Sequence, residues 1–248
     1  MDIVKSLIVW ITALCFAGIL FPLTFIIWCL VLPFDRQRFI THWLLMYQSI
    51  LISALVPIWK IRIEGREKAL SNSAYVIIAN HQSILDILLI NCLRYRFKWI
   101  SKIENINLPV LGWYLRMAGY ITVNRGNEES KAEMLERSDQ CLKQGISVML
   151  FPEGTRSVDG EIGFFKRGAF QLAIQNAVPI LPVVIDGTTS ILPKHGLIFR
   201  SGYNVTIKVL DPVNPSSFET GNPDILAGRL NSLMKSELNA MRAGIYAG

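Results

Sequence analysis

The chain has 248 residues, of which 51% are hydrophobic, with a mean hydropathy of +0.36, a formal net charge of +6 and an isoelectric point of about 9.2. This length accommodates one core domain with a small appendage, and the hydropathy excludes an ordinary soluble domain of average polarity. The positive charge favours a phosphate-bearing partner, such as nucleic acid, anionic lipid or a phosphorylated substrate, without choosing among them. The four cysteines lie far apart without metal-ligand spacing, so they indicate neither a disulfide framework nor a zinc site.

Two uncharged apolar runs occupy the first 60 residues. The first covers 29 residues, Ser6 to Phe34, which exceeds the about 20 residues of a spanning helix and the roughly 7–15 of a signal-peptide core. As one straight helix it would measure about 43 Å against about 30 Å of hydrocarbon, so we expect a tilt or a kink at Pro22. The second run, Phe39 to Trp59, crosses the membrane, re-enters it or forms a buried core helix. We expect a membrane-embedded helical hairpin over residues 1–60.

Strand-like and helical segments alternate from residue 61 to 248, which predicts one α/β domain with a mixed sheet flanked by helices. The continuous apolar runs 75–79 and 147–151 are typical of strands buried on both faces. The run Val178 to Ile185 contains two prolines, which predicts an edge or irregular strand, and Tyr203 to Leu210 alternates like an outer strand. Short strands are also expected at 97–100 and 120–123, and helices at 83–92, 108–117, 128–144, 166–177 and 224–240.

A histidine and an aspartate follow the apolar run 75–79, where ligands bind in open α/β sheets. A neutral histidine takes a proton from an alcohol when a carboxylate holds its other ring nitrogen, so His81 and Asp86 predict a general-base dyad. Alternatively, Ser83 and Asp86 form a capping-box-like pair, and His81 is an ordinary loop residue. No GxSxG, GxGxxG or GxxxxGK[ST] motif is present. A dyad without its own nucleophile points to acyl transfer onto an alcohol of the substrate.

The segment Phe151-Pro152-Glu153-Gly154-Thr155-Arg156-Ser157 follows the next strong strand. Its Pro, Gly, Thr and Ser residues are also typical of a simple turn. Arginine suits bidentate phosphate binding, so Arg156 is a candidate phosphate ligand. Glu153 is expected either to orient Arg156 or to bond a substrate hydroxyl.

Together, the Asn80-His81-x4-Asp86 run and the 151–157 segment resemble the glycerolipid acyltransferase family and, within it, the 1-acyl-glycerol-3-phosphate acyltransferases. Two further blocks match in family order over residues 75–186. They are Lys102, Pro109, Gly112, Gly119 and Val123-Asn124-Arg125, followed by the apolar run 178–183. The resemblance implies His81 as general base and Asp86 as its partner. It also implies an acceptor site made by the following residues: Glu153, Gly154, Thr155, Arg156, Lys102 and Arg125.

The resemblance further implies transfer of a fatty acyl group from acyl-CoA or acyl carrier protein to the sn-2 hydroxyl of lysophosphatidic acid, giving phosphatidic acid. It implies no metal and no redox cofactor, membrane lipids as surroundings, and no nucleic-acid partner. In bacterial members such N-terminal helices sit in the membrane, so we expect the bacterial inner membrane, with the catalytic domain on the cytoplasmic side. The alternatives are acylation of another lysolipid, a non-catalytic lipid-binding module and a hydrolase. Lys102 and Arg125 are also explained by an anionic membrane surface.

Overall fold

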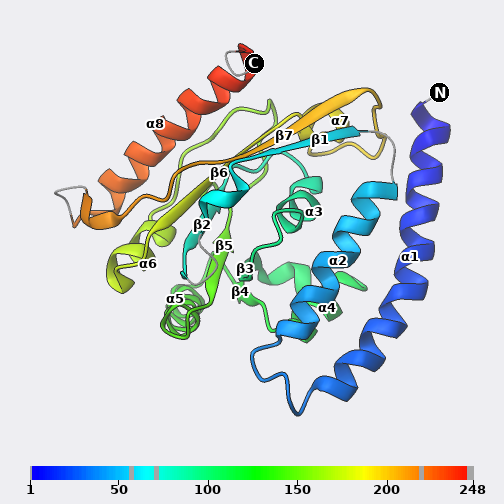
Figure 1. The fold of residues 1–248 in the computed structure, drawn as a ribbon, viewed down its shortest axis with the longest axis horizontal. Helices are drawn as coiled ribbons and strands as arrows, with labels where there is room; N and C mark the ends of the chain where they lie inside the picture. Colours follow the sequence, from blue (N-terminus) through cyan, green and yellow to red (C-terminus); the bar gives the residue numbers. More distant parts are fainter. Residues whose placement is uncertain (1, 56–58, 70–72, 218–220, 245–248) are drawn as a thin grey trace.

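The computed structural model describes residues 2–55, 59–69, 73–217 and 221–244 (Figure 1). These residues form eight α-helices around one seven-stranded sheet. The strands are β1 (Trp59–Glu64), β2 (Val76–Ala79), β3 (Phe97–Lys102), β4 (Ile121–Val123), β5 (Ser147–Leu150), β6 (Ile180–Asp186) and β7 (Tyr203–Val209). The helices are α1 (Asp2–Val31), α2 (Phe39–Leu55), α3 (Leu85–Asn91), α4 (Leu111–Met117), α5 (Glu128–Lys143), α6 (Gly168–Asn176), α7 (Thr188–Ile191) and α8 (Pro223–Arg242).

The sheet has the strand order β1-β7-β6-β2-β5-β3-β4. β2 lies between β5 and β6 and is parallel to both, and β3 and β4 continue in the same direction. β7 runs antiparallel to β6 and parallel to β1. This arrangement confirms the predicted mixed α/β sheet flanked by helices. Because five parallel strands end at one edge, the residues that follow β2, β3, β4, β5 and β6 converge there.

Successive side chains of a strand point to opposite faces of the sheet. Ile77 and Ala79 belong to one hydrophobic cluster, and Val76 and Ile78 belong to another. Helices α2, α3 and α4 cover the first face, and α5, α6 and α8 cover the second (Figure 1). Since both faces of β2 are buried, its sequence is a continuous apolar run without alternation.

The positions predicted for two strands are wrong. β6 pairs with β2 on one side and with β7 on the other, so it is not an edge strand. The carbonyl of Pro182 accepts a hydrogen bond from the amide of Leu210, just past the last paired residue of β7, Val209. The missing N–H of the proline therefore points to the end of this pairing, where its loss costs little. β7 is not an outer strand either, because β1 covers it; the charged residues of β1 hid that strand in the sequence.

The N-terminal hairpin consists of α1 and α2, which pack against each other. Of the described helices, α1 alone is long and apolar enough to cross a membrane, with 30 residues that run unbroken through Pro22. α2 has 17 residues and buries one face, including His42, Leu45 and Ser49, against the domain. Its other face is apolar and exposed. α2 is therefore both part of the domain core and the second helix of the N-terminal hairpin. Residues 56–58, at the end of the second apolar run, lie outside the described residues.

Candidate active site

The predicted site residues meet at the carboxyl edge of the five parallel strands. His81 follows β2, Lys102 ends β3, and Arg125 follows β4. The segment 151–157 follows β5 directly. Residues from four separate stretches of sequence are thereby brought into one place, as the strand order requires.

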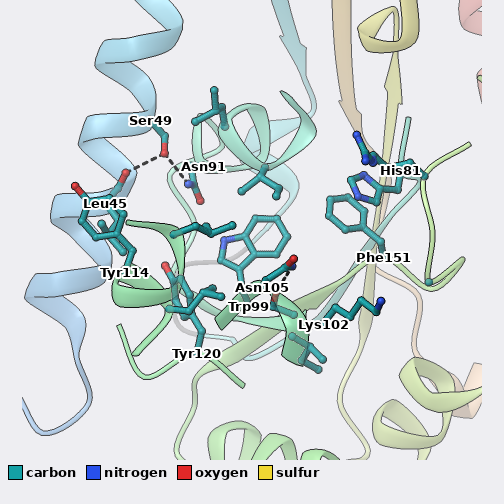
Figure 2. Close-up of a pocket in the computed structure, with 18 of the residues that line it drawn as sticks. Leu45, Ser49, His81, Asn91, Trp99, Lys102, Asn105, Tyr114, Tyr120 and Phe151 are labelled. Atoms are coloured by element: carbon teal, nitrogen blue, oxygen red, sulfur yellow. Dashed lines mark hydrogen bonds between the residues drawn. The ribbon is translucent and has the colours of Figure 1, made fainter. Parts of the chain in front are cut away.

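His81 and Asp86 form the predicted pair, with 2.8 Å between Nδ1 of the imidazole and Oδ2 of the carboxylate. An ionised carboxylate only accepts hydrogen bonds, so the proton lies on Nδ1 and Nε2 remains available as a base. The imidazole stacks on the ring of Phe151, with centroids 3.8 Å apart and an angle of 7° between the planes (Figure 2). The His81 side chain is 15% exposed and lines a cavity. The ring is thus held in one orientation with one nitrogen toward that cavity.

The Asp86 carboxylate is fully buried and also accepts three further hydrogen bonds. Its Oδ2 accepts the backbone N–H groups of Gln82 at 2.7 Å and Ser83 at 2.9 Å, and its Oδ1 accepts the hydroxyl of Thr188 at 2.6 Å. Half of a capping box is therefore present, since an acid in the first helical turn bonds the amide three residues earlier. The two alternative interpretations of Asp86 hold together: the same carboxylate shapes the loop and orients the histidine.

Glu153 lies beside His81 without lining the cavity. Its Oε1 accepts the backbone N–H of His81 at 2.9 Å, and its Oε2 accepts that of Gly163 at 2.9 Å. Burial raises the pKa of the Glu153 carboxyl, and the two backbone donors oppose that rise. Both oxygens have backbone partners, so Glu153 orients neither Arg156 nor, in this arrangement, a substrate hydroxyl. It joins the loop after β5 to the loop that carries His81.

The cavity has a volume of about 480 Å³. Figure 2 shows Trp99 between His81 and Phe151 on one side and the residues of α2 and α3 on the other. The part of the wall formed by the helices is mainly apolar and includes Leu45, Ile52, Ile87, Leu88, Leu111 and Leu115. Beside His81, the rest of the wall is formed by these residues: 99–102, Asn105, Tyr120, Arg125, Phe151, Gly154, Thr155, Arg156 and Lys194. One cavity therefore joins a basic wall, an apolar wall and the imidazole.

Four basic side chains of the described residues line this cavity, and we call them the basic mouth: Lys102, Arg125, Arg156 and Lys194. Lys102 forms an ion pair with Glu104, with 2.8 Å between Nζ and Oε1. Arg125 donates a hydrogen bond to the carbonyl of Gly154, and burial lowers the pKa of its guanidinium.

Gly154 has φ +74°, and a Cβ there would lie 3.0 Å from the ammonium of Lys166. The turn therefore requires glycine and sets Thr155 and Arg156 on the cavity wall.

The other two members of the basic mouth have no carboxylate partner within the described residues. Arg156 makes neither an ion pair nor a side-chain hydrogen bond there, although it lines the cavity. The ammonium of Lys194 donates to the hydroxyl of Thr155 at 3.1 Å. Predicted residues Thr155 and Arg156 therefore lie on the cavity wall, as do Gly154, Lys102 and Arg125.

No local sequence pattern pointed to Thr188 or Lys194, and no role was predicted for Gln82. Thr188 follows β6 and lies 102 residues from Asp86, to which its hydroxyl donates. Gln82 lies inside the first motif, and its buried side chain donates to the carbonyl of Gly160 at 2.8 Å. Correct strand order would have identified Thr188, because β6 pairs with β2 and both strands end at the same edge.

Comparisons with known proteins agree with this geometry. Residues 60–186 match the family model described as Acyltransferase. The chain is 37% identical over 189 residues to a chloroplastic 1-acyl-sn-glycerol-3-phosphate acyltransferase of Arabidopsis thaliana, covering 75% of this chain and 52% of that one. It is 32% identical to the human 1-acyl-sn-glycerol-3-phosphate acyltransferase beta, covering 65% and 58%. The chain thus spans about half the length of the curated relatives it matches.

A solved structure also matches nearly the whole fold. It is the crystal structure of the 1-acyl-sn-glycerophosphate acyltransferase from Thermotoga maritima, with a TM-score of 0.79 and 25% identity. The match covers 98% of this chain and 96% of that one. The N-terminal helices, the sheet and the C-terminal helix therefore follow an arrangement seen before.

Proposed function

This chain belongs to the acyltransferase family, and we propose that it is a 1-acylglycerol-3-phosphate O-acyltransferase. It transfers a fatty acyl group from acyl-CoA or acyl carrier protein to the sn-2 hydroxyl of 1-acyl-sn-glycerol 3-phosphate, giving phosphatidic acid. The observation that carries the proposal is a histidine–aspartate pair on the wall of a cavity that is basic in one part and apolar in another. The names of its relatives support the same acceptor.

The proposed chemistry begins at Nε2 of His81. This nitrogen takes the proton of the acceptor hydroxyl while the oxygen attacks the thioester carbonyl. Asp86 stabilises the imidazolium through the 2.8 Å contact to Nδ1. The tetrahedral intermediate collapses, the carbon–sulfur bond breaks, and the thiolate receives the proton from His81. An ester and a free thiol result, and His81 returns to its neutral form without a metal or redox cofactor.

The tetrahedral oxyanion needs hydrogen-bond donors. The amides of Gln82 and Ser83 donate to Asp86, and the amide of Gly154 donates to the carbonyl of Phe151. These three N–H groups are already bonded and do not serve as oxyanion donors. The amides of Thr155 and Arg156 have no partner among the described residues, and both residues line the cavity. We assign the oxyanion to these two amides.

The same proposal gives each wall of the cavity a part of the acceptor or donor. The basic mouth holds the phosphate, with Arg156 suited to a bidentate contact. The apolar wall between α2, α3 and α4 holds an acyl chain of the substrates. α1 anchors the chain in a membrane, which we take to be the bacterial inner membrane with residues 61–248 as the catalytic domain on the cytoplasmic side. The length and hydropathy of α1 support the anchor.

The test is turnover by the full chain in detergent micelles or phospholipid vesicles. Lysophosphatidate is supplied with acyl-CoA or with acyl carrier protein, and phosphatidic acid is measured by lipid chromatography. We expect acceptor-dependent product with at least one donor, and a preference for lysophosphatidate over lysophospholipids with larger headgroups. Free fatty acid formed at the same rate without acceptor would identify a hydrolase and overturn the proposal. Faster acylation of another lysolipid would show that lysophosphatidate is not the preferred acceptor, while the proposed acyl-transfer reaction would stand.

A further inference from the structure

Lys194 lies outside every motif of the sequence, yet it lines the cavity. It belongs to the loop between α7 and β7, residues 192–202, which we call the α7–β7 loop. Its ammonium donates to the hydroxyl of Thr155 at 3.1 Å, and His81, Gly154 and Arg156 line the same cavity. A lysine of this loop is therefore placed directly beside the segment that we assign to phosphate binding.

The charges of the basic mouth are not equivalent. Glu104 lies 2.8 Å from Lys102 and offsets its charge, and the guanidinium of Arg125 is bonded to the carbonyl of Gly154. Among the described residues no carboxylate lies within ion-pair distance of Arg156 or Lys194, and both flank Thr155. A cation without an adjacent carboxylate attracts an anion more strongly than one held in an ion pair, as Lys102 is. A phosphate dianion between them would form an ion pair with the lysine ammonium and a bidentate contact with the planar arginine guanidinium.

The α7–β7 loop is held in place by the N-terminal part of α1. The buried hydroxyl of Ser6 accepts the N–H of Phe199 at 2.7 Å and donates to its carbonyl at 3.4 Å. The indole N–H of Trp10 donates to the carbonyl of Leu197 at 2.9 Å, and its ring lies 5.4 Å from that of Phe199. The ammonium of Lys5 donates to the hydroxyl of Ser201 at 2.9 Å. Four hydrogen bonds and one ring contact thus join a helix near the start of the chain to residues almost 200 positions later.

The other end of the α7–β7 loop is tied to the catalytic loop, residues 80–86. The hydroxyl of Ser83 donates to the carbonyl of Leu192 at 2.7 Å. Lys194 therefore lies between a fixed point next to the dyad and a fixed point on α1. Because both ends of this segment are fixed, the residues between them have little conformational freedom. Ligand binding therefore costs less conformational entropy there.

We propose that Lys194 is a further binding residue for the acceptor phosphate, and that α1 positions it through Ser6 and the α7–β7 loop. This inference rests on the proposed function. α1 then has a second role beside that of an apolar anchor, because it holds part of the substrate site. In the opposing explanation Lys194 is a surface cation whose bond to Thr155 is only structural.

The decisive experiment compares Lys194→Ala, Lys194→Arg and wild type with two acceptors, lysophosphatidate and monoacylglycerol, which lacks the phosphate. We expect Lys194→Ala to raise KM for lysophosphatidate about tenfold with kcat little changed, and Lys194→Arg to recover most of the loss. Turnover of monoacylglycerol should not change. Arg200→Ala is the matched control, since it removes an exposed charge from the same loop outside the cavity.

An unchanged KM for lysophosphatidate in Lys194→Ala overturns the inference, and so does an equal loss with both acceptors. Neither result touches the proposed function as long as wild type acylates lysophosphatidate; no turnover in wild type would instead refute that function.

The role of α1 is tested by Ser6→Ala and by the double variant with Lys194→Ala. We expect Ser6→Ala to raise KM for lysophosphatidate about two- to fivefold, again without effect on monoacylglycerol. If Ser6 acts by positioning Lys194, the double variant should show the KM of Lys194→Ala alone, because coupled residues are not additive. If the two substitutions instead raise KM independently, so that their fold-changes multiply, Ser6 does not position Lys194. The phosphate contact of Lys194 would then stand without a role for α1.

Discussion

In the catalytic loop the polar side chains of Asn80, Gln82 and Asp86 are buried and bonded within the chain, whereas in the basic mouth Arg156 and Lys194 line the cavity without a carboxylate partner. The amide of Asn80 both donates to and accepts from the backbone of Ile185, at 2.8 Å in each case. The first region is fully bonded within the chain, and the second keeps two charges without a carboxylate partner among the described residues.

This difference assigns separate tasks to the two regions. Fixed, fully bonded groups stabilise a transition state without having to reorganise. Uncompensated cations contribute to binding of the ground state and the transition state alike, which changes KM more than kcat. Substitutions in the catalytic loop should therefore lower kcat, and those in the basic mouth should raise KM.

The largest effect is expected for His81→Ala. Removal of the proposed general base should lower kcat by about 10² to 10⁴-fold with a nearly unchanged KM for the acceptor. The fold should persist, because the ring is a partly exposed side chain stacked on Phe151. Steady-state kinetics and the thermal midpoint measure both quantities, with the exposed His195→Ala as a control. A variant with normal kcat and raised KM would show that His81 binds substrate and does not act in the chemical step. The catalytic loop and the basic mouth would then not differ in task.

The next effect is expected for Arg156→Ala, in KM for lysophosphatidate. Loss of a charge-assisted contact to phosphate corresponds to about a ten- to hundredfold rise, with kcat changed much less. Lys102→Ala is the internal comparison, and its rise should be smaller because Glu104 already offsets that charge at 2.8 Å. Equal effects of the two substitutions would show that the ion pair opens when substrate binds. An unchanged KM in Arg156→Ala would remove this arginine from the phosphate site.

A smaller effect is expected for Thr188→Val. The valine is nearly isosteric but lacks the hydroxyl that donates to Asp86 at 2.6 Å, so one carboxylate oxygen loses a buried donor. We expect kcat to fall about tenfold with KM unchanged, and Thr188→Ser to recover most of the activity. Kinetics of the two variants side by side separate the hydroxyl from the packing. A normal kcat in Thr188→Val together with a loss in Thr188→Ser would mean that packing of the methyl group, and not the hydrogen bond, matters.

The sequence predicted the elements of the catalytic loop well because they are local. A buried strand, a histidine and an aspartate five residues later lie on one short stretch, and so does the segment with Arg156. Three strands, those predicted at 75–79, 147–151 and 178–185, followed from continuous apolar runs. Asp86 was expected to be either a cap or a partner of the base; only its coordinates show that the roles coincide.

Contacts between distant segments were not predictable in the same way. The prolines of β6 suggested an edge or irregular strand, and 203–210 was expected as an outer strand, so the loop between them was not placed near the dyad. Once β6 is placed beside β2, Thr188 necessarily lies near Asp86, and the α7–β7 loop that carries Lys194 comes to the same edge. Both residues depend on strand order, which no periodicity within one segment determines.

The smallest effect concerns stability. In Glu153→Gln one carboxylate oxygen becomes an NH₂ group, which cannot accept the amide of His81 or Gly163. Loss of one such bond costs about 1–3 kcal/mol, or roughly 2–12 °C in thermal midpoint near pH 7. Thermal unfolding of both proteins in one detergent measures this difference.

The pH dependence of that difference separates burial from hydrogen bonding. Burial raises the pKa of Glu153 in the folded protein above its ordinary value, so the folded state takes up this proton at a higher pH than the unfolded chain does. The titration therefore favours the folded state as pH falls through the window between the two pKa values, and the benefit is lost as pH rises. Glutamine does not titrate, so the advantage of wild type should widen on acidification from pH 7. If it narrows, the two backbone donors outweigh burial, and Glu153 acts as a charged clamp on the His81 loop.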